Sequence, residues 1–175
     1  MSMQRHSLKG IAYLMIETKF GNLLTNVTSG IILHQVNAQG VMGRGIAGQI
    51  RKKWPRVFVD YSSVVQRLPG VDTADYLGRI IVSWVDKDLV VISIVGQQFY
   101  GNDGRMYTSY KALEEGLSKI MPLFGPNGSL QYLSSPTQVH FPKFGCGLGG
   151  ADWSVVQSLI ETHLPDLKKT LWLYE

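Results

Sequence analysis

The stretch "HQVNAQGVMGRGIAGQI", His34 to Ile50, follows a run of β-branched residues and carries four glycines. Glycine is favoured where φ is positive or where another group must approach the backbone closely, and it weakens an element that it interrupts. A loop of this composition, directly after a buried strand, either makes an awkward turn or receives a ligand.

The elements on either side of this loop can be assigned from residue patterns. Before it, "GIILHQVN" predicts a strand from Ile31 to Val36 that is buried on both faces. After it, "AGQIRKKWPRVFVDYSSVV" has apolar residues at helical spacing, and Pro55 is expected to begin a second helical piece. The first glycine loop therefore joins a strand to a helix.

A second glycine loop has the same setting. "TQVHFPKF" predicts a strand, "GCGLGG" follows it, and "ADWSVVQSLIETHL" predicts an amphipathic helix with Asp152 as its N-cap. The backbone N–H groups at the start of a helix have no partner within the helix and favour anions. Both helix starts are therefore expected to present free N–H groups to an anion.

Further strands and helices alternate along the rest of the chain. A strand is expected from Ile11 to Glu17, a hairpin is expected from "LGRIIVSW" and "LVVISIVGQQFY", and "KKTLWLYE" is a last strand. "TSYKALEEGLSKIM" predicts a helix with Thr108 or Ser109 as N-cap. This order predicts one α/β domain over residues 1–175, with helices covering a largely parallel or mixed sheet.

Composition and charge narrow the class of protein. The 175 residues are 45% hydrophobic and 17% charged, with no apolar run that spans a bilayer and no export signal. A single cysteine, Cys146, agrees with a reducing compartment, and we expect a cytoplasmic monomer. The net charge is +4, but only residues 51–56 hold a dense basic group, which is interpreted as a solvated helix end rather than a nucleic-acid site.

Common nucleotide motifs do not account for the loops. Gly145, Gly147 and Gly150 fit G-x-G-x-x-G, but only 25 residues follow Gly150, too few to complete a dinucleotide-binding unit. The P-loop pattern is absent from both loops. Two anion cradles in one domain instead suit a bridging diphosphate, as in a nucleotide diphosphate or its sugar derivative. Cys146, between glycines at a helix start, lies where a thiol pKa is lowered, although simple packing is the preferred interpretation.

Three motifs together resemble the macro domain family. "VNAQGVMGRGIA" (36–47) is similar to the family's loop around the distal ribose, "FGCGLGGADW" (144–153) to its phosphate loop, and "FGNLL" (20–24) to its adenine segment. The resemblance implies a three-layer α/β/α fold, ADP-ribose or ADP-ribose 1''-phosphate as ligand, and neither cofactor nor metal. The ligand-binding residues that it implies are Asn22, Leu23, Asn37, Gln39, Gly40, Gly43, Gly45, Ile46, Gly145, Cys146, Gly147, Leu148, Gly149 and Tyr174.

Within the family, the motifs resemble the branch with the yeast-type ADP-ribose 1''-phosphate phosphatase and the terminal ADP-ribose glycohydrolase. His34 stands where that phosphatase has its catalytic histidine, and Asn22 replaces the aspartate common in the family, as it does there. Gln97 and Gly149 stand where the glycohydrolase has a lysine and an aspartate, which disfavours its reaction. The resemblance therefore implies phosphate hydrolysis, with His34 as general base or nucleophile.

Two other functions stay open at this stage. One is a non-catalytic module that binds or sequesters ADP-ribose, and the other is removal of ADP-ribose from protein or nucleic acid without the lysine. Phe99, Tyr100 and Tyr174 are candidates for an adenine-stacking face, although aromatic residues at strand ends usually belong to a core or rim. No His, Cys or carboxylate cluster has metal-ligand spacing.

Overall fold

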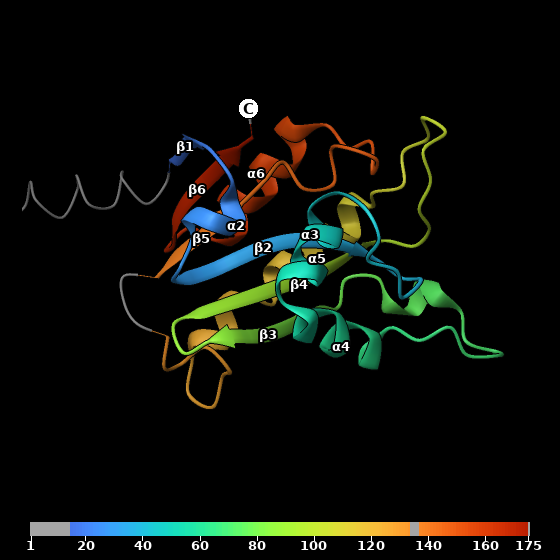
Figure 1. Ribbon diagram of the computed structural model, residues 1–175, viewed down its shortest axis with the longest axis horizontal. Helices are drawn as coiled ribbons and strands as arrows, with labels where there is room; N and C mark the ends of the chain where they lie inside the picture. The colour runs from blue at the N-terminus through green and yellow to red at the C-terminus, as the bar shows by residue number, and fades with distance from the viewer. Residues whose placement is uncertain (1–14, 134–136, 175) are drawn as a thin grey trace, which may run out of the picture.

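The central feature of the protein is a six-stranded sheet, seen in a computed structural model that describes residues 15–133 and 137–174. The spatial order of its strands is β1-β6-β5-β2-β4-β3 (Figure 1). The strands are β1 (Ile16–Phe20), β2 (Gly30–Asn37), β3 (Ile80–Asp86), β4 (Leu89–Gln97), β5 (Gln138–Phe141) and β6 (Lys168–Leu173). All neighbouring strands run parallel except β3 and β4, which form an antiparallel hairpin.

Helices cover both faces of this sheet and create two separate hydrophobic cores. They are α2 (Leu23–Asn26), α3 (Gly45–Lys53), α4 (Pro55–Val64), α5 (Tyr110–Ser118) and α6 (Trp153–His163), with 3-10 turns η1 (Thr73–Tyr76) and η2 (Met121–Phe124). One core packs α2, α3 and α4 on the sheet, and the other packs α5 and α6 on the opposite face. Figure 1 shows α3 and α4 in front of the sheet and α5 behind it. The predicted three-layer α/β/α fold with a mixed, largely parallel sheet is confirmed.

Local sequence signals set several element ends as expected. Pro55 opens α4, where its missing N–H costs no hydrogen bond. Ser109 caps α5 by accepting from the Ala112 N–H at 3.2 Å, and Asp152 caps α6 by accepting from the Ser154 N–H at 2.8 Å. The first strand differs, because β1 spans Ile16–Phe20, and the expected portion before Met15 lies outside the described residues.

The topology gathers three loops at one edge of the sheet. The loops after β2, β4 and β5 leave the carboxyl ends of adjacent parallel strands. The chain then reaches α3 on one face after β2, but α6 on the other face after β5. In open α/β sheets, ligands bind in the crevice where the helices diverge to opposite faces.

Candidate functional site

A cavity of about 640 Å³ lies at this edge, between the two glycine loops. Backbone and side chains of three loops and the ends of β2 and β4 form its walls. The lining residues are Gln35, Val36, Asn37, Val41, Gly43, Arg44, Gly45, Ile46, Ala47, Gln97, Tyr100, Gly101, Asn102, Pro142, Lys143, Phe144, Gly145, Gly147, Leu148 and Gly149. The structure therefore brings together eight of the predicted binding residues: Asn37, Gly43, Gly45, Ile46, Gly145, Gly147, Leu148 and Gly149.

The first glycine loop presents an open helix N-terminus to this cavity. Arg44 occupies the N-cap position of α3 with extended backbone, makes no side-chain cap hydrogen bond, and no acidic residue lies in the first turn. Gly45, Ile46 and Ala47 of that turn all line the cavity. Their N–H groups and the positive end of the helix dipole therefore form a site for an anion.

Asn37 holds the shape of the first loop from within. Its Oδ1 accepts from the Gln39 N–H at 2.9 Å, the Val41 N–H at 3.3 Å and the Tyr61 hydroxyl at 2.9 Å. Its Nδ2 donates to the Val41 carbonyl at 2.7 Å. An amide nitrogen carries two donor hydrogens, so one N–H of Asn37 is left for a ligand. Asn37 thus shapes the loop as well as lining the cavity.

The second glycine loop uses its backbone differently, and the prediction of a free helix start is wrong here. The Asp152 carboxylate accepts from both the N–H and the hydroxyl of Ser154, at 2.8 Å and 2.7 Å, and so caps α6 itself. The N–H groups of Gly147 and Leu148, which line the cavity, make no hydrogen bond within the described residues. This loop therefore offers loop amides rather than a helix N-terminus.

A buried hydrogen-bond network ties the second loop to the cavity floor. The Gln35 Nε2 donates to the Gln97 Oε1 at 2.6 Å and to the Thr108 hydroxyl at 2.9 Å, and that hydroxyl donates to the Gly145 carbonyl at 2.9 Å. The Gly149 carbonyl accepts from the N–H groups of Tyr107 and Thr108 at 2.9 Å and 3.0 Å. The network fixes the position of the phosphate loop predicted from the sequence.

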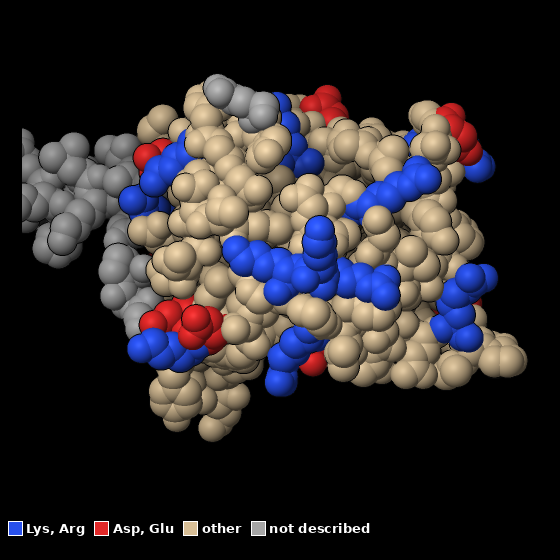
Figure 2. Space-filling view, in the orientation of Figure 1, with Lys and Arg blue, Asp and Glu red and all other residues tan. Residues whose placement is uncertain are grey.

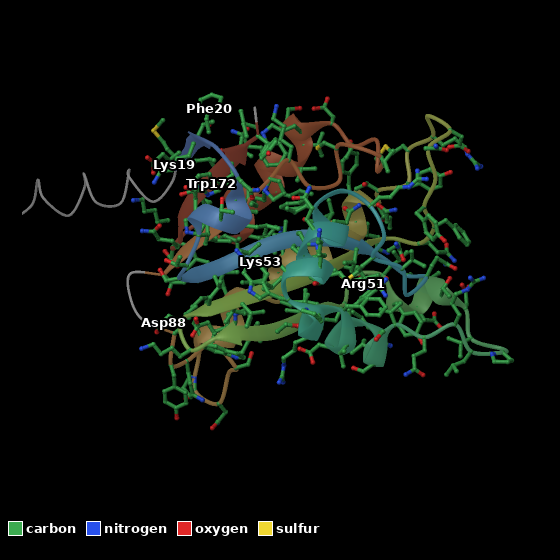
Figure 3. The ribbon with its side chains drawn as sticks, in the orientation of Figure 1. Lys19, Phe20, Arg51, Lys53, Asp88 and Trp172 are labelled. Atoms are coloured by element: carbon green, nitrogen blue, oxygen red, sulfur yellow. The ribbon has the colours of Figure 1, made fainter. Side chains whose placement is uncertain are left out.

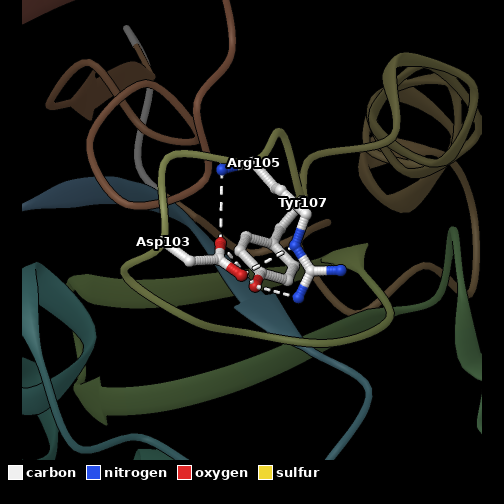
Figure 4. Close-up of polar contacts among 3 residues, drawn as sticks. All are labelled: Asp103, Arg105 and Tyr107. Atoms are coloured by element: carbon white, nitrogen blue, oxygen red, sulfur yellow. Dashed lines mark hydrogen bonds and ion pairs between the residues drawn. The ribbon is translucent and has the colours of Figure 1, made fainter.

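Tyr100, Gly101 and Asn102 form the third wall, and the loop that carries them is held by a polar cluster. The Asp103 carboxylate accepts from the Arg105 Nε at 2.7 Å and from the Tyr107 hydroxyl at 2.9 Å (Figure 4). These hydrogen bonds, with the Tyr107 hydroxyl the largest cause, lower the pKa of Asp103, which stays ionised and keeps the cluster paired. The cluster holds the loop that carries Tyr100 to the cavity.

The structure places His34 outside the cavity, which corrects the prediction of a catalytic contact. Its side chain is fully buried in the core beneath α3 and α4, and its Nε2 lies 2.7 Å from the Ser93 hydroxyl. Burial lowers the pKa of His34 to about 4, so the ring is neutral at physiological pH. Successive strand residues point to opposite faces, and here Gln35, rather than His34, reaches the cavity.

Six other predicted binding residues do not line the cavity. Asn22 caps α2, its Oδ1 accepting from the Leu24 N–H at 2.9 Å, and Leu23 is buried in the core. The Gln39 Nε2 donates to Thr73 and to the Gln98 carbonyl, both at 2.9 Å. The remaining three are Gly40, which turns the chain at φ 76°, Cys146, which packs against the core, and Tyr174, which is exposed.

The environment of Cys146 also corrects the expected effect on its thiol. Burial is the largest influence and raises the pKa of Cys146, while Lys143 partly opposes the shift. The thiol lies 3.5 Å from the Phe144 carbonyl and packs beside the second core. Cys146 is therefore a packing residue, as the preferred interpretation had it.

Sequence reasoning missed several residues of the cavity wall. Arg44 and Lys143 line it as cations, and Gln35 forms its floor. A signal existed for the two cations, because each lies within or beside a glycine loop. None existed for Gln35, since its strand is apolar on both faces and gives no sign of which face meets the cavity.

The ionisable groups of the cavity wall are Arg44, Tyr100 and Lys143; no carboxylate, histidine or cysteine lines it within residues 15–133 and 137–174. Over the same residues, no group of three His, Cys, Asp or Glu side chains could hold a metal ion. The wall can therefore bind an anion and orient it by backbone amides and cations.

Fold and cavity together define an α/β domain with an anion-binding crevice between two glycine loops. The family model of the Macro domain matches residues 33–160, and the chain belongs to the macro domain family. No helix within the described part of the chain has the length and apolar character to cross a membrane.

Two related proteins have names that state an activity. The ADP-ribose 1''-phosphate phosphatase of Saccharomyces cerevisiae is 22% identical, over 87% of this chain and 94% of the relative. A DNA ADP-ribosyl transferase–glycohydrolase fusion protein of Thermosipho africanus is 24% identical, over 79% of this chain but only 36% of its own length. This chain thus spans about a third of that relative.

Solved structures agree on the fold. A macrodomain protein of Streptomyces coelicolor superposes with a TM-score of 0.70 at 22% identity, covering 92% of this chain and 100% of that one. The macrodomain of Mycobacterium tuberculosis DarG gives 0.67 at 24% identity, covering 90% and 97%. Thermosipho africanus DarTG, solved in complex with ADP-ribose, gives 0.63 at 20% identity, covering 92% of this chain and 42% of that one.

Proposed function

We propose that the cavity binds ADP-ribose, with the diphosphate against the first turn of α3. The observation that carries this proposal is the uncapped start of α3, whose first three residues line the cavity. Gly147 and Leu148 line the same cavity, and their unpaired amides can supply further donors. Membership of the macro domain family and the ADP-ribose complex of DarTG support the choice of ligand.

The first glycine loop and the third wall offer different groups to the parts of the ligand. The α3 start, with Arg44 beside it, suits the diphosphate charge, and the remaining N–H of Asn37 suits a ribose hydroxyl. Tyr100, at the third wall, offers an aromatic ring for stacking. Asn22, Leu23 and Tyr174 lie outside the cavity wall, so an adenine contact with them would extend beyond it.

The test uses Gly147, where a larger side chain finds room in the free protein. A Cβ on Gly147 would meet no atom within 4 Å, and its φ is not in the left-handed region. Gly147→Leu is therefore expected to fold normally but to reduce ADP-ribose affinity about tenfold or more, by calorimetry. Gly147→Ala, the matched control, should lose much less, and equal affinity for all three proteins would place the ligand elsewhere.

A second candidate function is release of phosphate from ADP-ribose 1''-phosphate, which the similarity to the yeast phosphatase over nearly its whole length favours. In this reaction water attacks phosphorus, the bond from phosphorus to the 1'' oxygen breaks, and ADP-ribose and phosphate leave. Arg44 and Lys143 can stabilise the phosphate charge. His34 has no contact with the cavity, so the reaction is proposed without it.

Phosphate release by wild type and His34→Gln tests this second candidate. Equal rates are expected, because His34 bonds to Ser93 in the core. If His34→Gln releases phosphate more slowly than wild type but is equally stable to heat, His34 takes part in the reaction. Tight ADP-ribose binding without phosphate release would favour a binding module, and release of ADP-ribose from a modified protein or oligonucleotide would favour a glycohydrolase.

A further inference from the structure

The last turn of α3 and the start of α4 form a basic surface, here defined as Arg51, Lys52, Lys53 and Arg56. All four side chains are exposed, and Figure 2 shows the basic side chains of this region at the centre of one face, with acidic atoms mostly toward its edges. Arg51, Lys52 and Lys53 make no ion pair within the described residues, and Arg56 lies 3.5 Å from Asp60. Most of this charge is therefore not neutralised by the protein.

Two of these cations are held in place by aromatic rings. The Arg51 guanidinium lies 3.8 Å from the centre of the Phe58 ring, and the Lys53 amine lies 4.9 Å from that of Trp54 while donating to the Leu24 carbonyl. Figure 3 shows Arg51 and Lys53 on this near face of α3. A guanidinium stacked on a ring keeps its donors free for phosphate oxygens.

A hollow beside this surface lies next to the first glycine loop. It measures about 550 Å³ and is lined by Met42, Gly43, Gly48, Arg51, Lys52, Pro55, Phe58 and Val59. Gly43 also lines the main cavity, so the first glycine loop borders both spaces. The basic surface and the ligand cavity are therefore neighbours across the first glycine loop.

The cations and apolar groups of this surface favour one class of anionic partner over others. A single phosphate would need only one of the cations, whereas several cations spread over two helices suit a chain of charges. Val59, 61% exposed, and the Phe58 ring add an apolar surface against which a planar base can pack. An acidic peptide would use the cations but not the stacked ring, so a nucleic-acid strand fits better.

In place of the solvated helix end inferred from the sequence, we propose that the basic surface binds the phosphodiester backbone of a single nucleic-acid strand, with a base packed at Arg51 and Phe58. An ADP-ribose group carried by that strand would occupy the adjoining cavity, and this part rests on the proposed function. Docking over α3 would place several phosphates beside the cavity without using any residue of its wall. The surface would thus select ADP-ribose attached to nucleic acid over free ADP-ribose.

The experiment compares two triple variants that remove the same charge. Arg51→Gln/Lys52→Gln/Arg56→Gln alters the basic surface. Lys87→Gln/Lys111→Gln/Lys168→Gln removes two exposed cations, from the β3–β4 turn and α5, and the half-buried Lys168 of β6. Binding of a labelled, unmodified single-stranded oligonucleotide is followed by fluorescence anisotropy at several salt concentrations. Calorimetry with ADP-ribose and thermal melting are run on the same preparations.

We expect the surface variant to bind the strand about tenfold more weakly and the control variant within about twofold of wild type. The slope of log affinity against log salt should fall by about 2 in the surface variant alone, because single strands lose about 0.7 per phosphate contact. Its ADP-ribose affinity and melting temperature should stay unchanged.

Three outcomes would overturn the proposal: no strand binding by wild type at low salt, equal losses in both variants, or displacement of the strand by polyglutamate as readily as by unlabelled strand. The last would assign the surface to acidic protein segments. Strand binding without ADP-ribose binding supports the surface and refutes the proposed function, whereas ADP-ribose binding without strand binding refutes the surface alone.

Discussion

The first glycine loop ends at a helix whose N-terminus is open, whereas the second ends at a helix capped by its own carboxylate. Arg44 leaves the first turn of α3 free to face the cavity, and Asp152 closes the first turn of α6 through Ser154. The second loop compensates with free amides at Gly147 and Leu148 and with a network that fixes its position. The same strand, glycine and helix order thus yields two different ways to present N–H groups.

The largest expected effect is a difference in stability between substitutions at two glycines of the second loop. A Cβ on Gly149 would lie 2.4 Å from the Thr108 hydroxyl oxygen and 2.5 Å from the Gly145 carbonyl oxygen, whereas one on Gly147 meets open space. Gly149→Val should lower the free energy of unfolding by about 3 kcal/mol or more, and Gly147→Val should leave it nearly unchanged. Urea denaturation measures both, and equal stability would break the distinction between anchored and free parts of the loop.

Acid should weaken the strands that lead to both loops. Burial lowers the pKa of His34 on β2 and of His140 on β5 to about 4, against about 6.5 in the unfolded chain. The unfolded state therefore takes up protons first, and stability present above about pH 6.5 is lost as the pH falls toward 4. His34→Gln should remove about 2 kcal/mol of the loss between about pH 7 and about pH 5.

Urea midpoints at the two pH values measure this effect, with His140→Gln as the parallel variant for the second loop. A slope of stability against pH that is unchanged in both variants would contradict the burial of neutral histidines beneath the site.

Removing the Thr108 hydroxyl should loosen the second glycine loop but leave the first one unchanged. Thr108→Val keeps the shape but removes the hydroxyl between Gln35 and the Gly145 carbonyl, leaving buried polar atoms without a partner. A loss of about 1–2 kcal/mol in unfolding free energy is expected, together with weaker ADP-ribose binding. Thr108→Ser retains the hydroxyl and serves as the control. Full ADP-ribose affinity in Thr108→Val would show that the loop keeps its position without the network.

The smallest effects in stability have opposite signs at the two helix starts. Arg44→Asp supplies the missing cap of α3 and should raise the unfolding free energy by about 1 kcal/mol, while placing a negative charge at the proposed diphosphate site. Asp152→Ala should lower stability by about 1 kcal/mol with ADP-ribose affinity retained, since Asp152 lies outside the cavity wall.

Thermal melts and calorimetry on both proteins check the two signs. Unchanged ADP-ribose affinity in Arg44→Asp would show that the start of α3 does not receive the anion.

Much of the fold follows from local patterns in the sequence. The β-branched run before His34 gives β2, and Pro55, Ser109 and Asp152 mark helix starts by mechanisms that act within a few residues. The glycine loops likewise predict strand-to-helix connections, and in the structure both loops line one cavity.

The details of the site depend on contacts that local patterns do not carry. Gln35 reaches the cavity and His34 the core because of the strand's orientation between two apolar layers, where both faces look alike in sequence. The Asn37 side chain is used by its own loop, through Gln39 and Val41, and by Tyr61 on α4, which lies 24 residues along the chain. Tyr100 and Asn102 enter the wall through a loop held by its own polar cluster.

The uncapped start of α3 also has an evolutionary consequence. A side-chain cap at position 44 would make the free domain more stable, so the arginine represents stability given up at a binding surface. A laboratory selection for heat resistance alone should therefore enrich Asp, Ser or Asn at this position, whereas a selection that also demands ligand binding should keep them out. The amino-acid frequencies at position 44 after the two selections would measure how strongly ligand binding opposes stability in this domain.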